Sequence, residues 1–163
     1  MKPRDLFLLL GTNLGDRLTH LIQARDELSK VFGNSIKSSR VYRSEPWGVT
    51  NQPEFYNQVL IYSSLADPNQ VLQEILSIEQ RMGRVRAQKW GPRVIDIDIL
   101  LYGDLTIDTT ELTIPHPAIQ DRRFVLTLLD EIAAEVVHPV LGRSIHHLLA
   151  DCPDDGKVQA LEA

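Results

Sequence analysis

Two acidic residues stand one position apart in a segment that otherwise has the composition of a buried strand. The segment, WGPRVIDIDILLYG, runs from Trp90 to Gly103 and carries Asp96 and Asp98 among isoleucines and leucines. Because side chains alternate along a strand, both carboxylates should lie on one face, with their Cα atoms roughly 6.6 Å apart. Two like charges at that separation repel each other and lose hydration, so a cation between them would be stabilising. Mg²⁺ fits, because it binds carboxylate oxygens and readily keeps phosphate oxygens as further ligands.

A cluster of basic residues comes directly before this acidic pair. No acidic residue occurs between residues 81 and 93. Arginine forks neutralise phosphate oxygens while carboxylates hold a metal ion, so the two clusters together indicate a polyphosphate bridged by metal. Taken alone, a D-x-D pair is more often the polar face of a strand, and a basic run is usually a solvated surface or a nucleic-acid patch. The basic residues are Arg81, Arg84, Arg86, Lys89 and Arg93.

Two other polar side chains stand in unusual surroundings. Glu79 falls on the apolar stripe of a predicted helix, where a carboxylate needs a partner. A structural salt bridge to a nearby arginine is at least as plausible there as a direct ligand role. His116 lies between two prolines, which restrict the backbone and fix the direction of the ring. Because Arg122 and Arg123 follow six residues later, His116 is a candidate phosphate contact.

The elements that must position these residues follow from periodicity and turn signals. Strand, helix, two strands, helix and strand are expected in that order, which is the split βαβ or ferredoxin-like pattern (βαββαβ). It predicts an α+β fold with a mostly antiparallel sheet, helices packed on one face, C-terminal additions, and the other face left for loops and ligand. The expected strands are 5–10, 35–43, 56–65 and 90–103, and the expected helices are 14–32, 67–82 and 121–131.

Local signals refine these expectations. Gly11 should break the first strand, with Asn13 as the N-cap of the helix that follows. Asp67 and Pro68 form a strong start for the second helix, a cap followed by proline at the first helical position. In the strand with the acidic pair, one face should pack under the helices; its residues are Ile95, Ile97, Ile99 and Leu101.

Composition sets the class of protein. The chain has 163 residues, 43% hydrophobic and 24% charged, which is typical of a globular domain. A net charge of −5 disfavours nucleic acid and acidic membranes as partners. The single cysteine, Cys152, and the lack of a spanning apolar stretch or signal sequence predict a cytoplasmic protein. We expect one domain over residues 1–150, a polar tail over 151–163 that could fray, and a monomer.

Several common phosphate-binding and nucleophile motifs are absent from the sequence. It contains no GxxxxGK[ST] loop, no GxGxxG after a strand and no nucleophile elbow. Phosphate chemistry would therefore depend on arginines and metal rather than on a glycine-rich cradle.

Six stretches along the chain together resemble a known family, the 6-hydroxymethyl-7,8-dihydropterin pyrophosphokinases (HPPK) of folate biosynthesis. They occur in the family's order and span most of the chain. The combination of RxR, WGPRxxDxDI and PHPxxxxRxF is highly specific. The stretches are LGTNLGDR (10–17), YRSEPWG (42–48), QPEFYNQV (52–59), IEQRMGRVR (78–86), WGPRVIDIDILLYG (90–103) and LTIPHPAIQDRRFVL (112–126).

The resemblance implies an activity and a set of site residues. The family transfers diphosphate from ATP to the hydroxymethyl group of the pterin and releases AMP. By resemblance, Asp96 and Asp98 hold two Mg²⁺ ions, and Arg84 and Arg93 join them as catalytic residues. The implied ATP contacts are Arg84, Arg86, Lys89, Trp90, Arg93, Ile99, Thr113, His116 and Arg122. The implied pterin contacts are Ser44, Glu45, Trp47, Phe55, Asn57, Asp96 and Phe124, with Phe55 and Phe124 stacking on the ring.

Three positions depart from the family pattern. Phe55 stands where tyrosine is frequent, which keeps stacking and loses a hydroxyl contact. Lys89 stands where arginine is expected, which weakens a bidentate phosphate contact. Glu111 stands where a basic residue could touch the nucleotide. These changes affect individual contacts rather than the reaction.

Two other functions remain open from the residues alone. A nucleotidyltransferase or nuclease with a palm-like domain could also hold two metals on two carboxylates. A non-catalytic RNA-binding module of the same fold would place aromatic residues on its central strands. Aspartates occupy that place here, and they would repel a phosphate backbone in the absence of metal.

Overall fold

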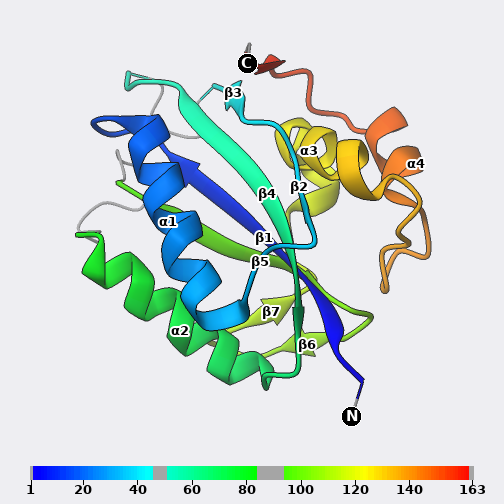
Figure 1. Ribbon diagram of the computed structural model, residues 1–163. Coiled ribbons are helices and arrows are strands. Elements are labelled where there is room, and N and C mark those ends of the chain that lie inside the picture. Colours follow the sequence, from blue (N-terminus) through cyan, green and yellow to red (C-terminus); the bar gives the residue numbers. More distant parts are fainter. Residues whose placement is uncertain (1, 46–50, 84–93, 162–163) are drawn as a thin grey trace.

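An antiparallel sheet forms the centre of the molecule (Figure 1). The structure is a computed structural model that describes residues 2–45, 51–83 and 94–161. In order across the sheet, the strands are β5 (Asp96–Tyr102), β1 (Arg4–Thr12), β4 (Phe55–Ser64), β3 (Tyr42–Ser44) and β8 (Val158–Ala160). A further short strand, β2 (Lys37–Ser38), pairs with β4, as β3 does.

Strand β1 is longer than the sequence predicts. It continues past Leu10 through Gly11 and Thr12, because Gly11 pairs with Asn57 of β4 on one side and with Asp96 of β5 on the other. The prediction that Gly11 breaks the strand was wrong. Two flanking strands supply the backbone partners that offset the weak strand preference of glycine.

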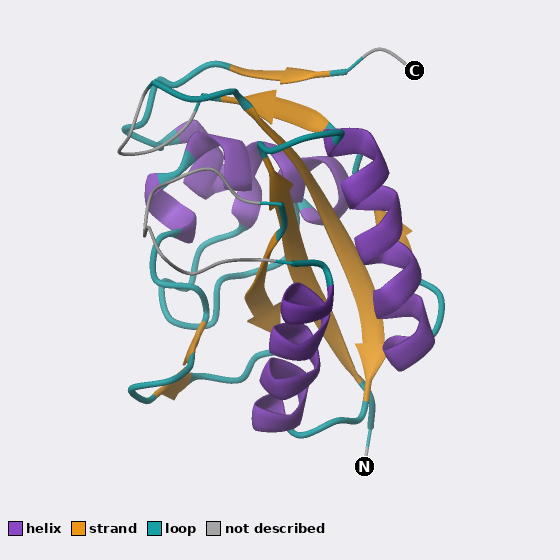
Figure 2. Cartoon of the chain, turned by 90° about the vertical axis from the view of Figure 1, so that its left-hand side faces the viewer, coloured by secondary structure: helices purple, strands orange, loops and turns teal. Residues whose placement is uncertain are grey.

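Helices α1 (Arg17–Phe32) and α2 (Pro68–Arg81) cover one face of the sheet (Figure 2). The N-cap of α1 is Asp16, whose carboxylate accepts a hydrogen bond from the Thr19 backbone at 3.2 Å, so the assignment to Asn13 was wrong. For α2, the predicted cap is confirmed: the Asp67 carboxylate accepts from the backbone N–H of Asn69 at 3.1 Å. The helices bury a core that includes Leu6, Leu8, Leu10, Leu21, Leu28, Val71, Ile75 and Ile78.

Helices α3 (Arg123–Ala133) and α4 (Ile145–Ala150) lie on the other side of the sheet (Figure 1). The expectation that this face is left to loops and ligand was therefore wrong in part, because α3 covers some of it. The long apolar side of α3 requires a second core of its own. That core includes Phe7, Leu9, Val59, Ile61, Phe124, Val125, Leu128 and Leu129.

Strand β5 contains an irregularity that changes which side chains face which core. Ile99 pairs with Leu8 and Leu101 pairs with Phe7, so Leu100 is an extra residue between them. Beyond such a bulge the alternation of faces is reversed. Ile95, Ile97 and Ile99 pack against the α1 and α2 side as predicted, whereas Leu101 lies in the α3 core, contrary to the prediction.

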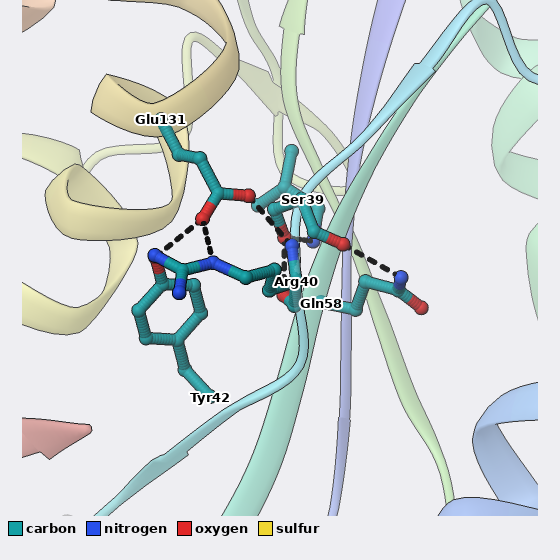
Figure 3. A network of polar contacts seen from close by, with 6 residues as sticks. Ser39, Arg40, Tyr42, Gln58 and Glu131 are labelled. Carbon is teal, nitrogen blue, oxygen red and sulfur yellow. Dashed lines mark hydrogen bonds and ion pairs between the residues drawn. The ribbon is translucent and has the colours of Figure 1, made fainter. Parts of the chain in front are cut away.

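The predicted strand 35–43 is divided into β2 and β3. Between them, the hydroxyl of Ser39 accepts from the Val59 backbone at 3.0 Å, and the Ser39 carbonyl accepts from the Gln58 amide at 2.8 Å (Figure 3). The register with β4 shifts by one residue across this interruption. Side-chain bonds of this kind compete with the regular ladder.

Three short strands were not expected from the sequence. β6 (Ile107–Asp108) and β7 (Thr113–Ile114) pair with each other, and β8 pairs with β3 from within the expected polar tail. Elements of two or three residues carry no usable periodicity. Among the helices of the described residues, none is long and apolar enough to cross a membrane.

Candidate functional site

Two candidate residues, Asn57 and Asp96, lie in one row across the sheet with Gly11 between them. Gly11 of β1 is paired with Asn57 of β4 and with Asp96 of β5, so the side chains of Asn57 and Asp96 share one face of the sheet. Asp98 is on the same face two residues further along β5, opposite Leu9. Leu9 belongs to the core under α3, which identifies this face as the α3 side. The acidic pair and the candidate pterin amide are therefore brought together on it.

Gly11 contributes no side chain between Asn57 and Asp96 in this row. A Cβ atom at this position would lie 3.1 Å from Asn57 Oδ1 and 3.6 Å from Phe55 Cδ1. The first distance is tighter than ordinary van der Waals contact, so a side chain at this position would force Asn57 to shift. We did not select Gly11 as a site residue from the sequence. A glycine directly after a run of strand leucines often marks a close approach of a ligand or another backbone, and this pattern could have identified it.

The amide of Asn57 has a fixed orientation. Asn57 is 3% exposed, and its Nδ2 donates to the hydroxyl of Ser44 on β3 at 2.7 Å. Phe55, two residues before it on β4, is half-buried and pairs with Ser44 in the sheet. Phe124 is 8% exposed at the start of α3. A buried, oriented amide beside an aromatic ring is suited to a flat heterocycle with hydrogen-bonding edges.

Two hydrogen bonds with the backbone of other residues hold His116. The ring Nδ1 accepts from the backbone N–H of Ala118 at 3.1 Å, and the backbone N–H of His116 donates to the Leu100 carbonyl at 2.9 Å. In the neutral ring the proton is then on Nε2, which can donate to a phosphate oxygen. The Ile114–Pro115 peptide bond just before it is cis.

The electrostatic surroundings of His116 connect it to the acidic pair. Burial lowers the pKa of His116, the charge of Arg122 lowers it further, and the charge of Asp96 acts in the opposite direction. The charges of Arg122 and Asp96 thus both act on the His116 ring, which connects the candidate phosphate contacts to the acidic pair electrostatically.

The acidic pair fits a hard divalent cation. Asp96 and Asp98 are both half-exposed, so their carboxylates can reach a ligand while the strand that carries them is paired with β1. Within residues 2–45, 51–83 and 94–161, no group of three His, Cys, Asp or Glu side chains is arranged to hold a metal ion. Two carboxylates alone suit Mg²⁺, which usually takes one or two protein carboxylates and completes its shell with water and phosphate oxygens.

Glu79 supports the strand from its outer edge. It is 2% exposed on α2, and its Oε2 accepts from the backbone N–H of Ile97 at 2.8 Å. Ile97 lies between Asp96 and Asp98, so Glu79 fixes the backbone that joins the two carboxylates. The two alternatives drawn from the sequence, a salt bridge with an arginine and a ligand role, did not include this backbone contact. Sequence periodicity places a residue on a helix face but does not identify a backbone partner on another element.

The remaining candidate residues either lie apart from the row of Asp96, Gly11 and Asn57 or fall outside the described residues. Thr113 on β7 lines the same cavity as His116. Ile99 is buried on the α1 and α2 side, so its side chain is not brought together with the acidic pair. Arg123 turns away to the C-terminal segment, and Glu45 is exposed. Six candidates lie outside the described residues: Trp47, Arg84, Arg86, Lys89, Trp90 and Arg93.

Comparison with known proteins gives consistent results. A family model described as 7,8-dihydro-6-hydroxymethylpterin-pyrophosphokinase (HPPK) matches residues 7–134. The chain is 42% identical over 140 residues to a 2-amino-4-hydroxy-6-hydroxymethyldihydropteridine pyrophosphokinase of Aquifex aeolicus, covering 86% of this chain and 87% of that protein. An enzyme of the same name from Synechocystis is 42% identical over 146 residues, covering 88% and 74% of the two chains.

Longer proteins also match over part of their length. The chain is 40% identical over 140 residues to the folic acid synthesis protein fol1 of Pneumocystis carinii, which covers 86% of this chain but 19% of that protein. The crystal structure of wild-type HPPK-DHPS from Plasmodium falciparum superimposes with a TM-score of 0.73 at 18% identity, over 91% of this chain and 44% of that one. That likeness concerns the fold alone. The matching family model and the relatives of similar length show that the chain belongs to the 7,8-dihydro-6-hydroxymethylpterin-pyrophosphokinase family.

Proposed function

We propose that this chain transfers a diphosphate group from ATP to the hydroxymethyl group of 6-hydroxymethyl-7,8-dihydropterin and releases AMP. The observation that carries the proposal is the row of Asp96, Gly11 and Asn57. It joins a carboxylate suited to metal and phosphate to an oriented amide suited to a heterocycle, with only a glycine between them. A chain of this family needs both properties side by side to bring the pterin hydroxyl to the triphosphate.

The pterin contacts follow from this row. Asn57, oriented by Ser44, would pair with the mixed donor and acceptor edge of the heterocycle, and Phe55 and Phe124 would stack on its faces. We assign supporting contacts to Glu45 and Trp47. Because Phe55 lacks a hydroxyl group, its contribution is stacking alone.

The proposed phosphate contacts lie outside this row, after strand β7. His116 would donate from Nε2 to a phosphate oxygen, and Arg122 would add a fixed positive charge. We assign Thr113 and the backbone of Ile99 to the nucleotide. Further ATP contacts are proposed for the basic segment, at Arg84, Arg86, Lys89, Trp90 and Arg93, with Arg84 and Arg93 as catalytic residues.

The proposed reaction is an in-line displacement at the β-phosphorus of ATP. The pterin hydroxyl oxygen forms a bond to that phosphorus, and the bond from the phosphorus to the oxygen bridging the α-phosphate breaks. AMP leaves with the bridging oxygen and its electron pair, and the hydroxyl proton passes to a carboxylate or to water. Asp96 and Asp98 would hold two Mg²⁺ ions, whose charge would be shared with the phosphate oxygens. The protein's contribution is alignment and charge neutralisation.

The setting of the site is also part of the proposal. We infer that the strand order β5-β1-β4-β3 is a ferredoxin-like arrangement, to which α3, α4 and β8 are C-terminal additions. We propose a single catalytic domain, formed by the expected residues 1–150 together with β8, acting as a monomer on small molecules, without nucleic acid and in the cytoplasm.

The decisive experiment removes the acidic pair. The protein is mixed with Mg-ATP and 6-hydroxymethyl-7,8-dihydropterin, and AMP formation is followed for the wild type and for Asp96→Asn and Asp98→Asn. Each variant should lose at least about 100-fold in rate, because the loss of one precisely placed charge-stabilising group typically costs that much. Asp104→Asn is the matched control, since Asp104 is an exposed aspartate in the turn after the same strand. Full activity in Asp96→Asn or Asp98→Asn would refute the assigned site.

A further inference from the structure

Helix α3 begins beside the candidate site without a cap from its own N-terminal residue. Arg122 occupies the N-cap position, and its side chain makes no capping hydrogen bond. The first N–H groups of a helix have no partner within the helix and need one from elsewhere. The start of α3 therefore depends on another part of the chain.

Asp154, thirty-one residues further along the chain, supplies that partner. Its Oδ2 accepts from the backbone N–H of Arg123 at 3.0 Å, and its Oδ1 accepts from the N–H of Gly156 at 2.8 Å. A carboxylate at this place also interacts favourably with the helix dipole. Asp154 thus does for α3 what an N-cap aspartate does for an ordinary helix, although it belongs to a distant segment.

The side chain of Arg123 strengthens the same junction. Its Nε donates to the Asp154 carbonyl at 2.6 Å, and its guanidinium donates to the Cys152 carbonyl at 3.3 Å. Arg123 lies between Arg122 and Phe124, the proposed phosphate and pterin contacts. Any shift of this first helical turn would move both neighbouring side chains.

The C-terminal segment reaches the opposite wall of the site with its other end. Strand β8 pairs with β3 so that Val158 is opposite Ser44, and Gln159 accepts a hydrogen bond from the guanidinium of Arg43 at 2.7 Å. Ser44 is the residue that accepts from the Asn57 amide. The segment 152–160 therefore holds the start of α3 at one end and the partner of Asn57 at the other.

We propose that residues 152–160 form a strap that positions the substrate-binding residues from both sides. Asp154 fixes Arg122 and Phe124 through the first turn of α3, and β8 fixes Ser44 and Asn57 through β3. Neither part of the strap needs to touch a substrate, so both act as positioning elements. This inference builds on the proposed function, because it concerns the same substrates.

The two ends predict different kinetic effects. Asp154→Ala should raise KM for both the pterin and ATP, each by about fivefold. This is the change in an equilibrium constant that corresponds to the stabilisation a helix N-cap typically provides. Deletion of residues 157–163 leaves Asp154 in place and removes β8. It should raise KM for the pterin more than KM for ATP, because β8 pairs directly with β3, whereas it meets α3 only through Val158 and Ala160 in the shared core.

Matched variants separate this effect from general loss of stability. Asp155→Ala changes the adjacent, exposed aspartate and should leave both KM values unchanged. Asp154→Asn retains an acceptor for the Arg123 N–H and should restore most of the loss, because asparagine caps helices as well as aspartate does. All assays are run well below the Tm of each variant.

The outcomes separate the two proposals. If the wild type forms no AMP, and if it binds neither Mg-ATP nor 6-hydroxymethylpterin in a fluorescence titration, the proposed function fails. If the wild type is active but Asp154→Ala lowers only Tm and keeps both KM values, the strap is merely structural and the inference is overturned. The same holds if the deletion changes both KM values equally.

Discussion

At the scale of single residues, Gly11 is the position where an added side chain would disturb Asn57. Gly11→Ala places a methyl group 3.1 Å from Asn57 Oδ1, so the amide must move. The backbone of Gly11 does not have a positive φ, and β1 should therefore form normally. Because overpacking costs about 1–3 kcal/mol, we expect a KM for the pterin raised at least about fivefold. Steady-state kinetics of Gly11→Ala measure the KM, with Tm as a control for folding. An unchanged KM would show that Gly11 does not border the pterin site.

His116 should make stability depend on pH in a defined direction. The pKa of His116 is lowered in the folded protein, chiefly by burial, whereas histidine in an unfolded chain has a pKa of about 6.5. Below that pH the unfolded state binds more protons, so the free energy of unfolding falls as pH falls. We expect the wild type to lose stability from pH 7.5 to 5.5 faster than His116→Gln does. Urea titrations at both pH values test this, and parallel losses would contradict the assignment.

At the scale of elements, Glu79 connects α2 to β5 through the N–H of Ile97. Glu79→Ala leaves that buried donor without this acceptor, which should lower the free energy of unfolding by about 1–3 kcal/mol. Glu79→Gln keeps an acceptor oxygen and should lose less. Glu74→Ala, at a half-buried position on the same helix, is the control. Equal losses for Glu79→Ala and Glu79→Gln in urea denaturation would rule out the hydrogen bond as the cause.

A second connection between elements joins α3 to β3 and to the residues just before it (Figure 3). The Glu131 carboxylate accepts from the Tyr42 hydroxyl at 2.5 Å and from the Arg40 backbone at 2.6 Å. Burial alone would raise the pKa of Glu131, but the hydrogen bonds from Tyr42 and Arg40 outweigh it and lower the pKa.

A double-mutant cycle of Tyr42→Phe and Glu131→Gln should give a coupling energy of about 1 kcal/mol at pH 7. Since the folded pKa of Glu131 is depressed, this stabilisation is present above the unfolded value of about 4.3 and is lost as pH falls through the folded pKa. Urea denaturation of the four proteins at pH 7 and at successively lower pH values measures both effects. A coupling energy that stays constant down to the pH at which the wild type unfolds would exclude an ionised Glu131 as its source.

At the scale of the whole molecule, local patterns predicted the elements better than their packing. Alternation correctly placed Ile97 with the α1 core and Asp96 and Asp98 on the other face, because strand geometry is local. It failed at Leu101, because the bulge at Leu100 arises from pairing with β1. The Asp67 cap was predictable from adjacent residues. The cap that Asp154 provides was not, because its helix begins thirty-one residues earlier.

The residues of the candidate site likewise fall into those that the sequence suggested and those that only the packing revealed. Residue types and spacing identified Asp96, Asp98 and His116, and family resemblance added Asn57 and Phe124. Gly11 and Glu79 acquire their roles only when the strands are placed side by side, since Gly11 separates two side chains from different strands and Glu79 binds a backbone amide eighteen residues away. Roles that depend on contacts between distant segments cannot be read from one stretch of sequence.

The central claim is that the chain moves a diphosphate, and the nucleotide product tests it most directly. A ³¹P NMR time course of the wild type with Mg-ATP and 6-hydroxymethyl-7,8-dihydropterin follows every phosphorus species at once. Attack at the β-phosphorus predicts AMP and pterin diphosphate appearing in equal amounts as ATP disappears. ADP together with a pterin monophosphate, or ATP that remains unchanged, would contradict it.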